Sequence, residues 1–132
     1  MVEPSAGTPQ LRKLGIVPGA RWSVVGADPG WHFETAPDAA TDVGASAQAD
    51  VVLVFVRAAA ELEPALVEHE QRVFPAGALW IAWPRKAAGH VSDLGDALVR
   101  DAALARRLVD VKVAALDRDW SALKLVWRRE YR

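Results

Sequence analysis

Two uninterrupted apolar runs in the middle of the chain are the clearest pattern in the sequence. Residues 50–56 read DVVLVFV and residues 79–83 read LWIAW. Runs without alternation are typical of strands buried on both faces, as in a parallel sheet with helices on each side. Between them, Leu62 and Leu66 have helical spacing and predict a helix over 58–74. Two parallel strands joined by a helix form a right-handed crossover almost without exception.

Two helix starts can be predicted from local signals. Pro64 is compatible only with a first turn or a kink, because proline removes a hydrogen bond inside a helix. We therefore expect the regular part of the first helix to begin near Glu63. A second helix is predicted from the leucines and alanines that follow residue 93, and either Ser92 or Asp93 can serve as its N-cap.

The flanking segments predict three more strands. Residues 21–26 (RWSVVG) form a short strand candidate that runs into a turn. Residues 109–116 alternate between apolar and other positions, and 121–128 form the last candidate. The turn between these two runs has the length of an antiparallel hairpin. Residues 31–48 show no sustained hydrophobic periodicity, so the pattern predicts neither a helix nor a strand there.

This order of elements predicts an α/β fold, a small Rossmann-like three-layer sandwich of about five strands. The sheet is expected to be mainly parallel with a C-terminal antiparallel hairpin, in the order 1-2-3-5-4. The plan resembles the second half of a class I methyltransferase sheet, and residues 74–81 (FPAGALWI) resemble a turn of that superfamily. Residues 1–12, rich in Pro, Gly, Ser and Thr, predict a flexible N-terminal tail before a single domain at 13–132.

The charge of the chain is close to balanced, with 16 basic and 17 acidic side chains. A clear basic excess would be expected of a protein that grips nucleic acid through phosphates. Nine of the basic residues lie in residues 100–132, which leaves room for an anionic partner near the C-terminus. There are no cysteines, no apolar region typical of a secretory signal and no apolar run of about 20 residues. We therefore expect a cytoplasmic protein.

The usual cofactor and metal motifs are missing from the sequence. The turn after the first predicted strand, Gly26 to Gly30, contains glycines, but Pro29 lacks a backbone donor and no helix clearly follows. Walker, G-x-S-x-G and H-E-x-x-H patterns are absent. His69 lies between two glutamates and is expected to be solvated, whereas His32 and His90 follow strand ends and have no ligand spacing. We expect neither a cofactor nor a metal ion.

A ligand, if one binds, is expected outside the carboxyl ends of the parallel strands, where open α/β sheets hold their ligands. Arg85 and Lys86 are adjacent cations there and can hold a carboxylate or phosphate. The favoured interpretation of the two is a pair of solvated cations before a capped helix. The candidate ligand-binding residues at these ends are Asp28, Arg57, Trp83, Arg85, Lys86, Asp117 and Trp120.

Six tryptophans are many for 132 residues. Trp80 and Trp83 are three positions apart on one strand, so they point to opposite faces, and Trp80 is expected in the core. Trp83, Trp120 and Trp127 lie where indoles are often partly exposed, which would indicate a partner or dimer surface. The two lysines of the hairpin strands, at 112 and 124, are expected to be near neighbours.

Several phrases together resemble an uncharacterised bacterial family, domain of unknown function 3052. They are KLGI at 13–16 with Gly19, WPRK at 83–86, DL at 93–94, LVDVKVAA at 108–115, and Asp117 with Trp120 and Ser121. The resemblance extends over about residues 13–129. Arg85, Arg107, Ala114 and Ala122 replace the usual Lys, Gly, Cys and Gly, so no thiol chemistry applies to this member. The resemblance implies no activity.

Three functional hypotheses follow. The first is a non-catalytic module that binds a protein partner, possibly itself, or a small anionic ligand at the strand ends. The second is a small enzyme or a methyltransferase-like relic that uses Lys86 or Lys112 with Asp28 or Asp117 as acid–base groups. The third is weak nucleic-acid binding through the basic C-terminal third, against which the near-neutral charge argues.

Overall fold

The centre of the molecule is a six-stranded sheet in the order β2-β1-β3-β4-β6-β5. The computed structural model describes residues 8–132. The strands are β1 (Arg21–Val25), β2 (Thr41–Asp42), β3 (Val51–Phe55), β4 (Ala78–Pro84), β5 (Leu108–Ala115) and β6 (Trp120–Trp127). β2, β1, β3 and β4 pair in parallel, and β6 pairs antiparallel with both β4 and β5. The mainly parallel α/β sheet with its C-terminal hairpin is confirmed.

The strand count differs from the expectation by one short edge strand. The five predicted strands keep their expected mutual order, and β2 adds to the outer edge of β1. β2 has two residues, both exposed, so no burial pattern marks it in the sequence. Backbone hydrogen bonds hold it: Thr41 donates to the carbonyl of Ala20, and Val43 donates to that of Trp22.

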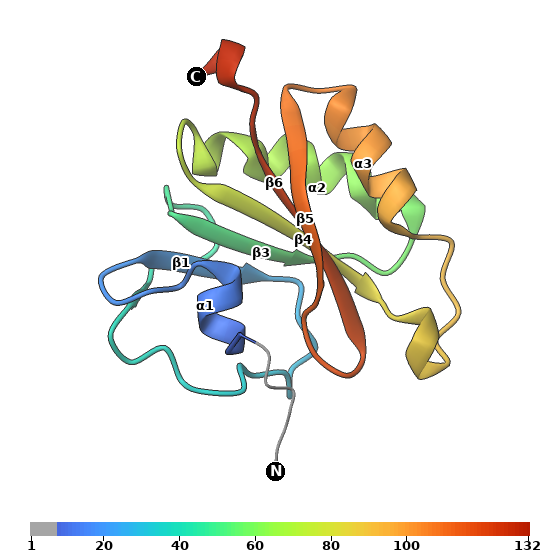
Figure 1. Cartoon of the computed structure of the whole chain (residues 1–132), viewed down its shortest axis with the longest axis horizontal. Coiled ribbons are helices and arrows are strands. Elements are labelled where there is room, and N and C mark those ends of the chain that lie inside the picture. Colours follow the sequence, from blue (N-terminus) through green and yellow to red (C-terminus); the bar gives the residue numbers. More distant parts are fainter. Residues whose placement is uncertain (1–7) are drawn as a thin grey trace.

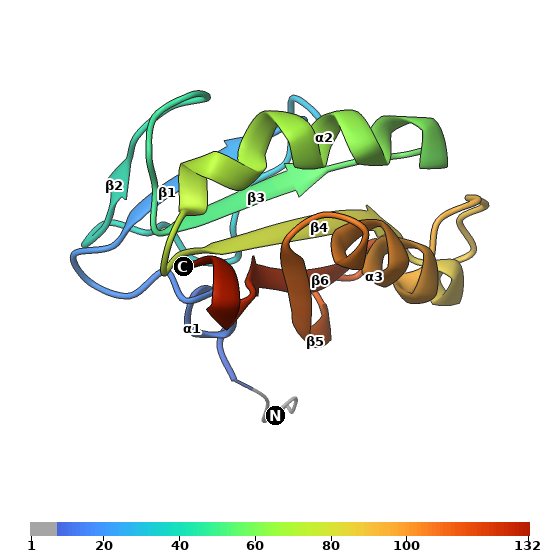
Figure 2. The same ribbon diagram turned by 90° about the horizontal axis from the view of Figure 1, so that it is seen from above.

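Helices cover the sheet unevenly. α2 (Leu62–His69) and α3 (Asp96–Leu104) pack on one face, whereas α1 (Gln10–Leu14) lies on the other with the segment that follows β1. Figure 2 shows α2 and α1 on opposite sides of the strands. Short 3-10 turns complete the chain: η2 (Ala59–Glu61), η3 (Glu70–Val73), η4 (Lys86–Ala88) and η5 (Arg129–Tyr131). In the described part of the chain, no helix has both the length and the apolar content needed to cross a membrane.

The predicted crossover helix at 58–74 is present but is regular only in its middle. The α-helical part begins at Leu62, one residue before the expected start, and 3-10 turns flank it on both sides. Pro64 therefore lies in the first turn, where its missing N–H removes no intrahelical bond.

The predicted N-cap of the second helix was wrong. α3 begins at Asp96 after Gly95, and neither Ser92 nor Asp93 caps it. The Asp93 carboxylate instead accepts a 2.8 Å hydrogen bond from the backbone N–H of Ala59, at the start of η2. Asp93 therefore bonds a backbone donor 34 positions away in the chain and not the helix that follows it.

The tryptophans of the C-terminal half are core residues. Trp80 and Trp83 belong to different cores on opposite faces of β4, which confirms the expectation for that pair. The expectation of partly exposed indoles was wrong, because Trp83, Trp120 and Trp127 expose only 5%, 8% and 2%. The indole of Trp127 also donates to the carbonyl of Glu70. An exposed tryptophan surface is therefore absent from these positions.

Three other expectations can be compared with the structure. Lys112 and Lys124 are directly opposite on β5 and β6, which confirms that they are neighbours. His69 is not solvated, as its position between two glutamates suggested, but is buried with 1% exposure. The boundary drawn between residues 12 and 13 falls inside α1, whose Gln10 is buried and donates to the carbonyl of Leu116. Residues 1–7 of the predicted tail lie outside the described residues.

Candidate functional site

The carboxyl ends of β1, β3 and β4 meet at one edge of the sheet, beside the turn that joins β5 to β6 (Figure 1). Two hollows open there. The first, the arginine hollow, is about 620 Å³ and is lined by Arg85, Ala87, Ala88, Arg118 and Asp119. The second, the Trp120 hollow, is about 360 Å³ and is lined by Asp28, Arg57, Pro84, His90, Asp119 and Trp120. Asp119 lines both hollows, so they are neighbours.

Three of the predicted residues meet in the Trp120 hollow. The guanidinium of Arg57 donates to the carboxylate of Asp28 at 2.6 Å and lies 5.3 Å from the ring centre of Trp120. Asp28 follows β1 and Arg57 follows β3, so their ion pair joins the loops after two adjacent strands. Both charges are satisfied within the pair, which leaves little net charge for a ligand.

The arginine hollow has a different charge balance. Nη1 of Arg85 donates to the carbonyls of Asp117 and Arg118, both at 3.3 Å. Arg118 forms no side-chain hydrogen bond or ion pair with the described residues. The acid of this hollow, Asp119, contacts Nε2 of His90 at 3.0 Å. Two guanidinium groups therefore face one carboxylate that already has a partner.

The other predicted candidates lie nearby with different roles. Lys86 begins η4, is exposed, and has no hydrogen bond or ion pair within the described part of the chain. Trp83 lies in the core on the α2 and α3 side of the sheet. Asp117 closes the hairpin turn: Oδ1 accepts from the backbone N–H groups of Asp119 and Trp120. The structure thus brings Asp28, Arg57 and Trp120 together and places Arg85 in the adjacent hollow.

Sequence reasoning missed Arg118 and Asp119, which line this site from the hairpin turn. In the sequence they are ordinary turn residues, and only the packing of the turn against η4 brings them beside Arg85. The backbone N–H of Arg85 donates to the carbonyl of Asp119 at 2.8 Å and fixes that packing. The sequence offered one signal for these two residues, which is a highly charged turn next to a predicted strand end.

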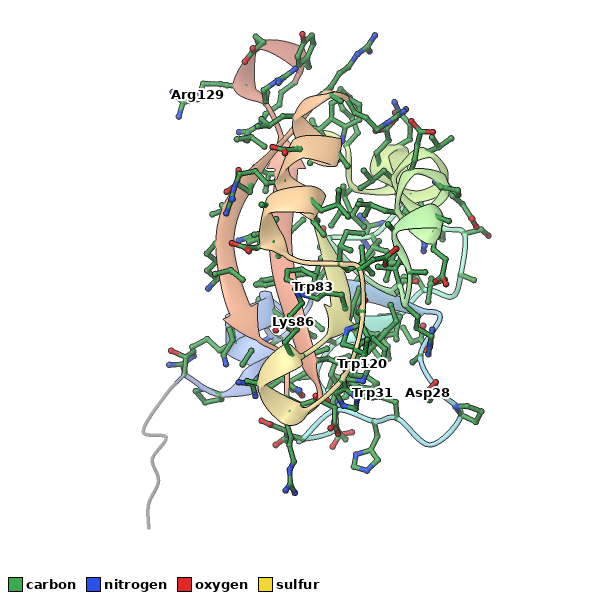
Figure 3. The ribbon with its side chains drawn as sticks, turned by 90° about the vertical axis from the view of Figure 1, so that its right-hand side faces the viewer. Asp28, Trp31, Trp83, Lys86, Trp120 and Arg129 are labelled. Atoms are coloured by element: carbon green, nitrogen blue, oxygen red, sulfur yellow. The ribbon has the colours of Figure 1, made fainter. Side chains whose placement is uncertain are left out.

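The segment after β1 has no periodic pattern in the sequence. In the structure it places aromatic rings over the strand ends. Trp31 packs 5.0 Å from the ring of Phe33 and 5.0 Å from that of Phe55, the last residue of β3. On its other side Phe55 lies 4.8 Å from Trp120. Figure 3 shows Asp28, Trp31 and Trp120 gathered at one end of the molecule.

A nucleotide-type cofactor, which Rossmann-like folds commonly bind at this edge, requires backbone donors and open space after the first strand. The hollow after β1, about 520 Å³, is instead lined mainly by apolar side chains, and no helix N-terminus supplies donors there. A Cβ on Gly26 would lie 2.9 Å from the carbonyl oxygen of Phe55, so this glycine serves close packing of the two strand ends. Pro29 has no N–H, no helix follows β1 before β2, and Trp31 occupies the adjoining space. These residues do not fit such a cofactor.

An acid–base arrangement of Lys and Asp side chains is not assembled either. Lys86 and Lys112 contact no carboxylate in residues 8–132, and Lys112 lies over the ring of Trp80. The carboxylates of Asp28 and Asp117 are bonded to Arg57 and Trp31. His32 and His90 do not converge: His32 contacts the carbonyl of Phe33, and His90 contacts Asp119. Within residues 8–132, no three His, Asp or Glu side chains are grouped so as to hold a metal ion.

No protein-family model and no curated protein matches the chain. Solved structures do resemble it, and two of them illustrate the likeness. A protein of the NADB-Rossmann superfamily from Streptococcus agalactiae has a TM-score of 0.54 at 12% identity, over 91% of this chain and 68% of that one. The B. subtilis M1A22 tRNA methyltransferase TrmK has a TM-score of 0.54 at 11% identity, over 90% of this chain and 65% of that one. The chain has a methyltransferase-like, Rossmann-type fold.

Proposed function

We propose that this protein is a non-catalytic module that binds a small anionic ligand, such as a phosphate or carboxylate compound, in the arginine hollow. The observation that carries the proposal is the excess of positive charge there. Arg85 and Arg118 line the hollow, and its single lining carboxylate, Asp119, is paired with His90. Guanidinium groups match the oxygens of phosphate and carboxylate with paired N–H donors.

The two arginines would contribute in different ways. Arg85 is held in place by the hairpin carbonyls through Nη1, and its other N–H groups have no partner among the described residues. A guanidinium that is already oriented loses less conformational entropy when a ligand binds. Arg118 is exposed and free of side-chain partners in residues 8–132, so it can close over the ligand from the turn.

The enzyme alternative is the weaker one. The methyltransferase-like fold supports descent from a cofactor-binding ancestor, but fold alone does not carry activity. The segment after β1 offers a nucleotide-type cofactor a mainly apolar hollow and no helix N-terminus, as described above. We therefore infer that the fold is retained as a scaffold and that the cofactor site is not.

We also propose that the chain belongs to domain of unknown function 3052, and the sequence phrases support this. Their residues have structural positions that explain why such phrases recur together. Leu14 and Ile16 are core residues under the sheet, Trp83 and Trp120 fill the two cores, and Asp117 closes the hairpin turn. The residues of these phrases would then be those that stabilise the fold and its strand-end loops.

The test is a titration of the protein with inorganic phosphate at constant ionic strength, followed by thermal unfolding. We expect a saturable rise in Tm for the natural protein. In Arg118→Gln the phosphate affinity should fall about 10-fold or more, because a charge-assisted hydrogen bond contributes roughly 1.5–3 kcal/mol. Arg12→Gln is the matched control, since Arg12 is an exposed arginine of α1 outside the lining of the hollow.

Two results would contradict the proposal. One is a Tm that phosphate and simple carboxylates leave unchanged in the natural protein. The other is an equal response in Arg118→Gln and in the natural protein, which would assign any stabilisation to general salt effects.

A further inference from the structure

A second group of arginines lies at the opposite end of the molecule from the candidate site. We call it the C-terminal arginine cluster: Arg106, Arg107, Arg128, Arg129 and Arg132. The first two belong to the turn between α3 and β5, and the other three follow β6. Antiparallel pairing of Leu108 with Trp127 brings these two segments side by side (Figure 1). In Figure 3 Arg129 lies at the end far from Asp28 and Trp31.

Two of the five guanidinium groups form hydrogen bonds and ion pairs with other parts of the fold. Arg106 forms a two-pronged ion pair with Glu70, at 2.7 and 2.6 Å. Arg128 donates to the carbonyls of Leu104 and Arg106, at 3.3 and 3.0 Å. These contacts attach the end of β6 to the turn before β5, so the base of the cluster is fixed.

The outer part of the cluster is ordered around Tyr131. The guanidinium of Arg107 lies 5.5 Å from the centre of this ring, and that of Arg128 lies 5.1 Å from it. The Nε of Arg132 donates to the carbonyl of Trp127 at 2.8 Å. A cation over an aromatic face is held without using its hydrogen-bond donors on a carboxylate. These side chains are therefore positioned before any partner arrives.

The charge of the cluster is not compensated within the described residues. The acids in contact with it are Glu70, which neutralises Arg106, and Glu130, at 3.9 Å from Arg128. Arg107 and Arg129 are exposed and have no carboxylate partner in residues 8–132. The cluster thus carries five positive side chains against two negative ones, on a chain whose net charge is −1.

We propose that the C-terminal arginine cluster binds an acidic segment of a partner protein. Arginine clusters recognise acidic and phosphorylated peptide motifs through charge-assisted, often two-pronged, hydrogen bonds. The small extent of the cluster and the near-neutral chain favour a short acidic segment over nucleic acid, which is usually bound by a clearly basic domain. This surface is separate from the arginine hollow, and the proposal does not depend on the ligand of that hollow.

The experiment measures fluorescence anisotropy of a labelled oligoglutamate peptide, with oligoglutamine of equal length as the uncharged probe. We expect oligoglutamate to bind the natural protein and oligoglutamine not to bind. In Arg107→Gln with Arg129→Gln the affinity should fall about 10-fold or more, because each lost charge-assisted bond is worth roughly 1.5 kcal/mol or more. Arg12→Gln is the control that removes an exposed arginine outside both the cluster and the arginine hollow, and it should keep the affinity.

Three outcomes would overturn the proposal. One is an anisotropy of labelled oligoglutamate that the natural protein leaves unchanged. Another is equal affinity of oligoglutamate for the double variant and for the natural protein. Tighter binding of a labelled oligouridylate of equal charge, with affinity that falls steeply with salt, would assign the cluster to nucleic acid. Thermal unfolding of the double variant checks that it is folded, which is expected because both side chains are exposed.

Discussion

The indole nitrogen of Trp31 donates a 2.9 Å hydrogen bond to Oδ2 of Asp117, a residue 86 positions later in the chain. The bond joins the segment after β1 to the turn of the C-terminal hairpin. Oδ1 of the same carboxylate accepts the two N–H groups that close this turn. One aspartate therefore holds both the hairpin turn and the aromatic segment that covers the strand ends.

This bond should contribute measurably to stability. Trp31→Phe keeps an aromatic ring against Phe55 but removes the donor to Asp117, and we expect the free energy of unfolding to fall by about 1–2 kcal/mol. Urea unfolding measures the change. Trp22→Phe is the matched control, because the buried indole nitrogen of Trp22 has no hydrogen-bond partner among the described residues. Equal losses in the two variants would show that only packing, and not the bond, matters at Trp31.

The covered strand ends predict a lack of response to the cofactors common in this fold class. S-adenosylmethionine and NAD should leave the Tm of the natural protein unchanged, because the hollow after β1 is mainly apolar and neither Pro29 nor a helix N-terminus donates to it. Trp31→Ala should not restore binding, since the missing helix N-terminus after β1 is unaffected. A saturable rise in Tm with either cofactor would contradict the assignment, and isothermal titration would confirm such binding.

His69 is a buried histidine held in its neutral form. Nη1 of Arg72 lies 3.2 Å from Nδ1 of His69, and because arginine can only donate, Nδ1 is the acceptor and Nε2 carries the proton. Burial is the main cause that lowers the pKa of His69 below its ordinary value of 6.5. Arg72 lowers it further, and Glu68 opposes this shift.

The lowered pKa of His69 determines the sign of a pH effect. The unfolded chain takes up a proton near pH 6.5 whereas the folded chain resists it, so stability is present above this pH and is lost as the pH falls. The loss cannot exceed about 1.4 kcal/mol per pH unit for one proton. Urea unfolding measures the free energy of unfolding at about pH 7.5 and about pH 5.5. The difference between the two values should be smaller in His69→Gln than in the natural protein. An unchanged difference would mean that other groups cause the pH dependence.

Asp93 should stabilise the start of the crossover helix and not α3. Asp93→Ala removes the acceptor of the Ala59 N–H and should cost about 0.5–2 kcal/mol, with faster amide exchange at Ala59 than global unfolding explains. Asp93→Asn keeps the side-chain oxygen and should restore most of the protection. Faster exchange confined to α3 would instead support the cap that the sequence pattern indicated.

Much of the sheet could be predicted because its signals are local. The apolar runs that became β3 and β4 are continuous and β-branched or aromatic, and the crossover between them has a fixed hand. The antiparallel hairpin follows from two apolar runs and a short turn. β2 could not be predicted, because two exposed residues pair with β1 through backbone bonds alone.

The candidate site could be predicted only in part. The edge of the sheet, Arg57 and Arg85 follow from the rule that ligands bind beyond the carboxyl ends of parallel strands. Arg118 and Asp119 could not be recognised, since their relation to Arg85 depends on how the hairpin turn packs against η4. The burial of Trp120 and Trp127 was also beyond the sequence, because local position does not determine what covers an indole.

The sequence by itself determined five of the six strands, the crossover and the hairpin, since periodicity and turn residues act between neighbours in the chain. Only the tertiary structure decided the path of residues 27–40 and the charge balance of the strand-end hollows. Trp31 contacts Phe55 and Asp117 at distances in sequence that no local pattern encodes, and this packing covers part of the strand ends. Which charges are paired there, and which remain available, follows from that packing.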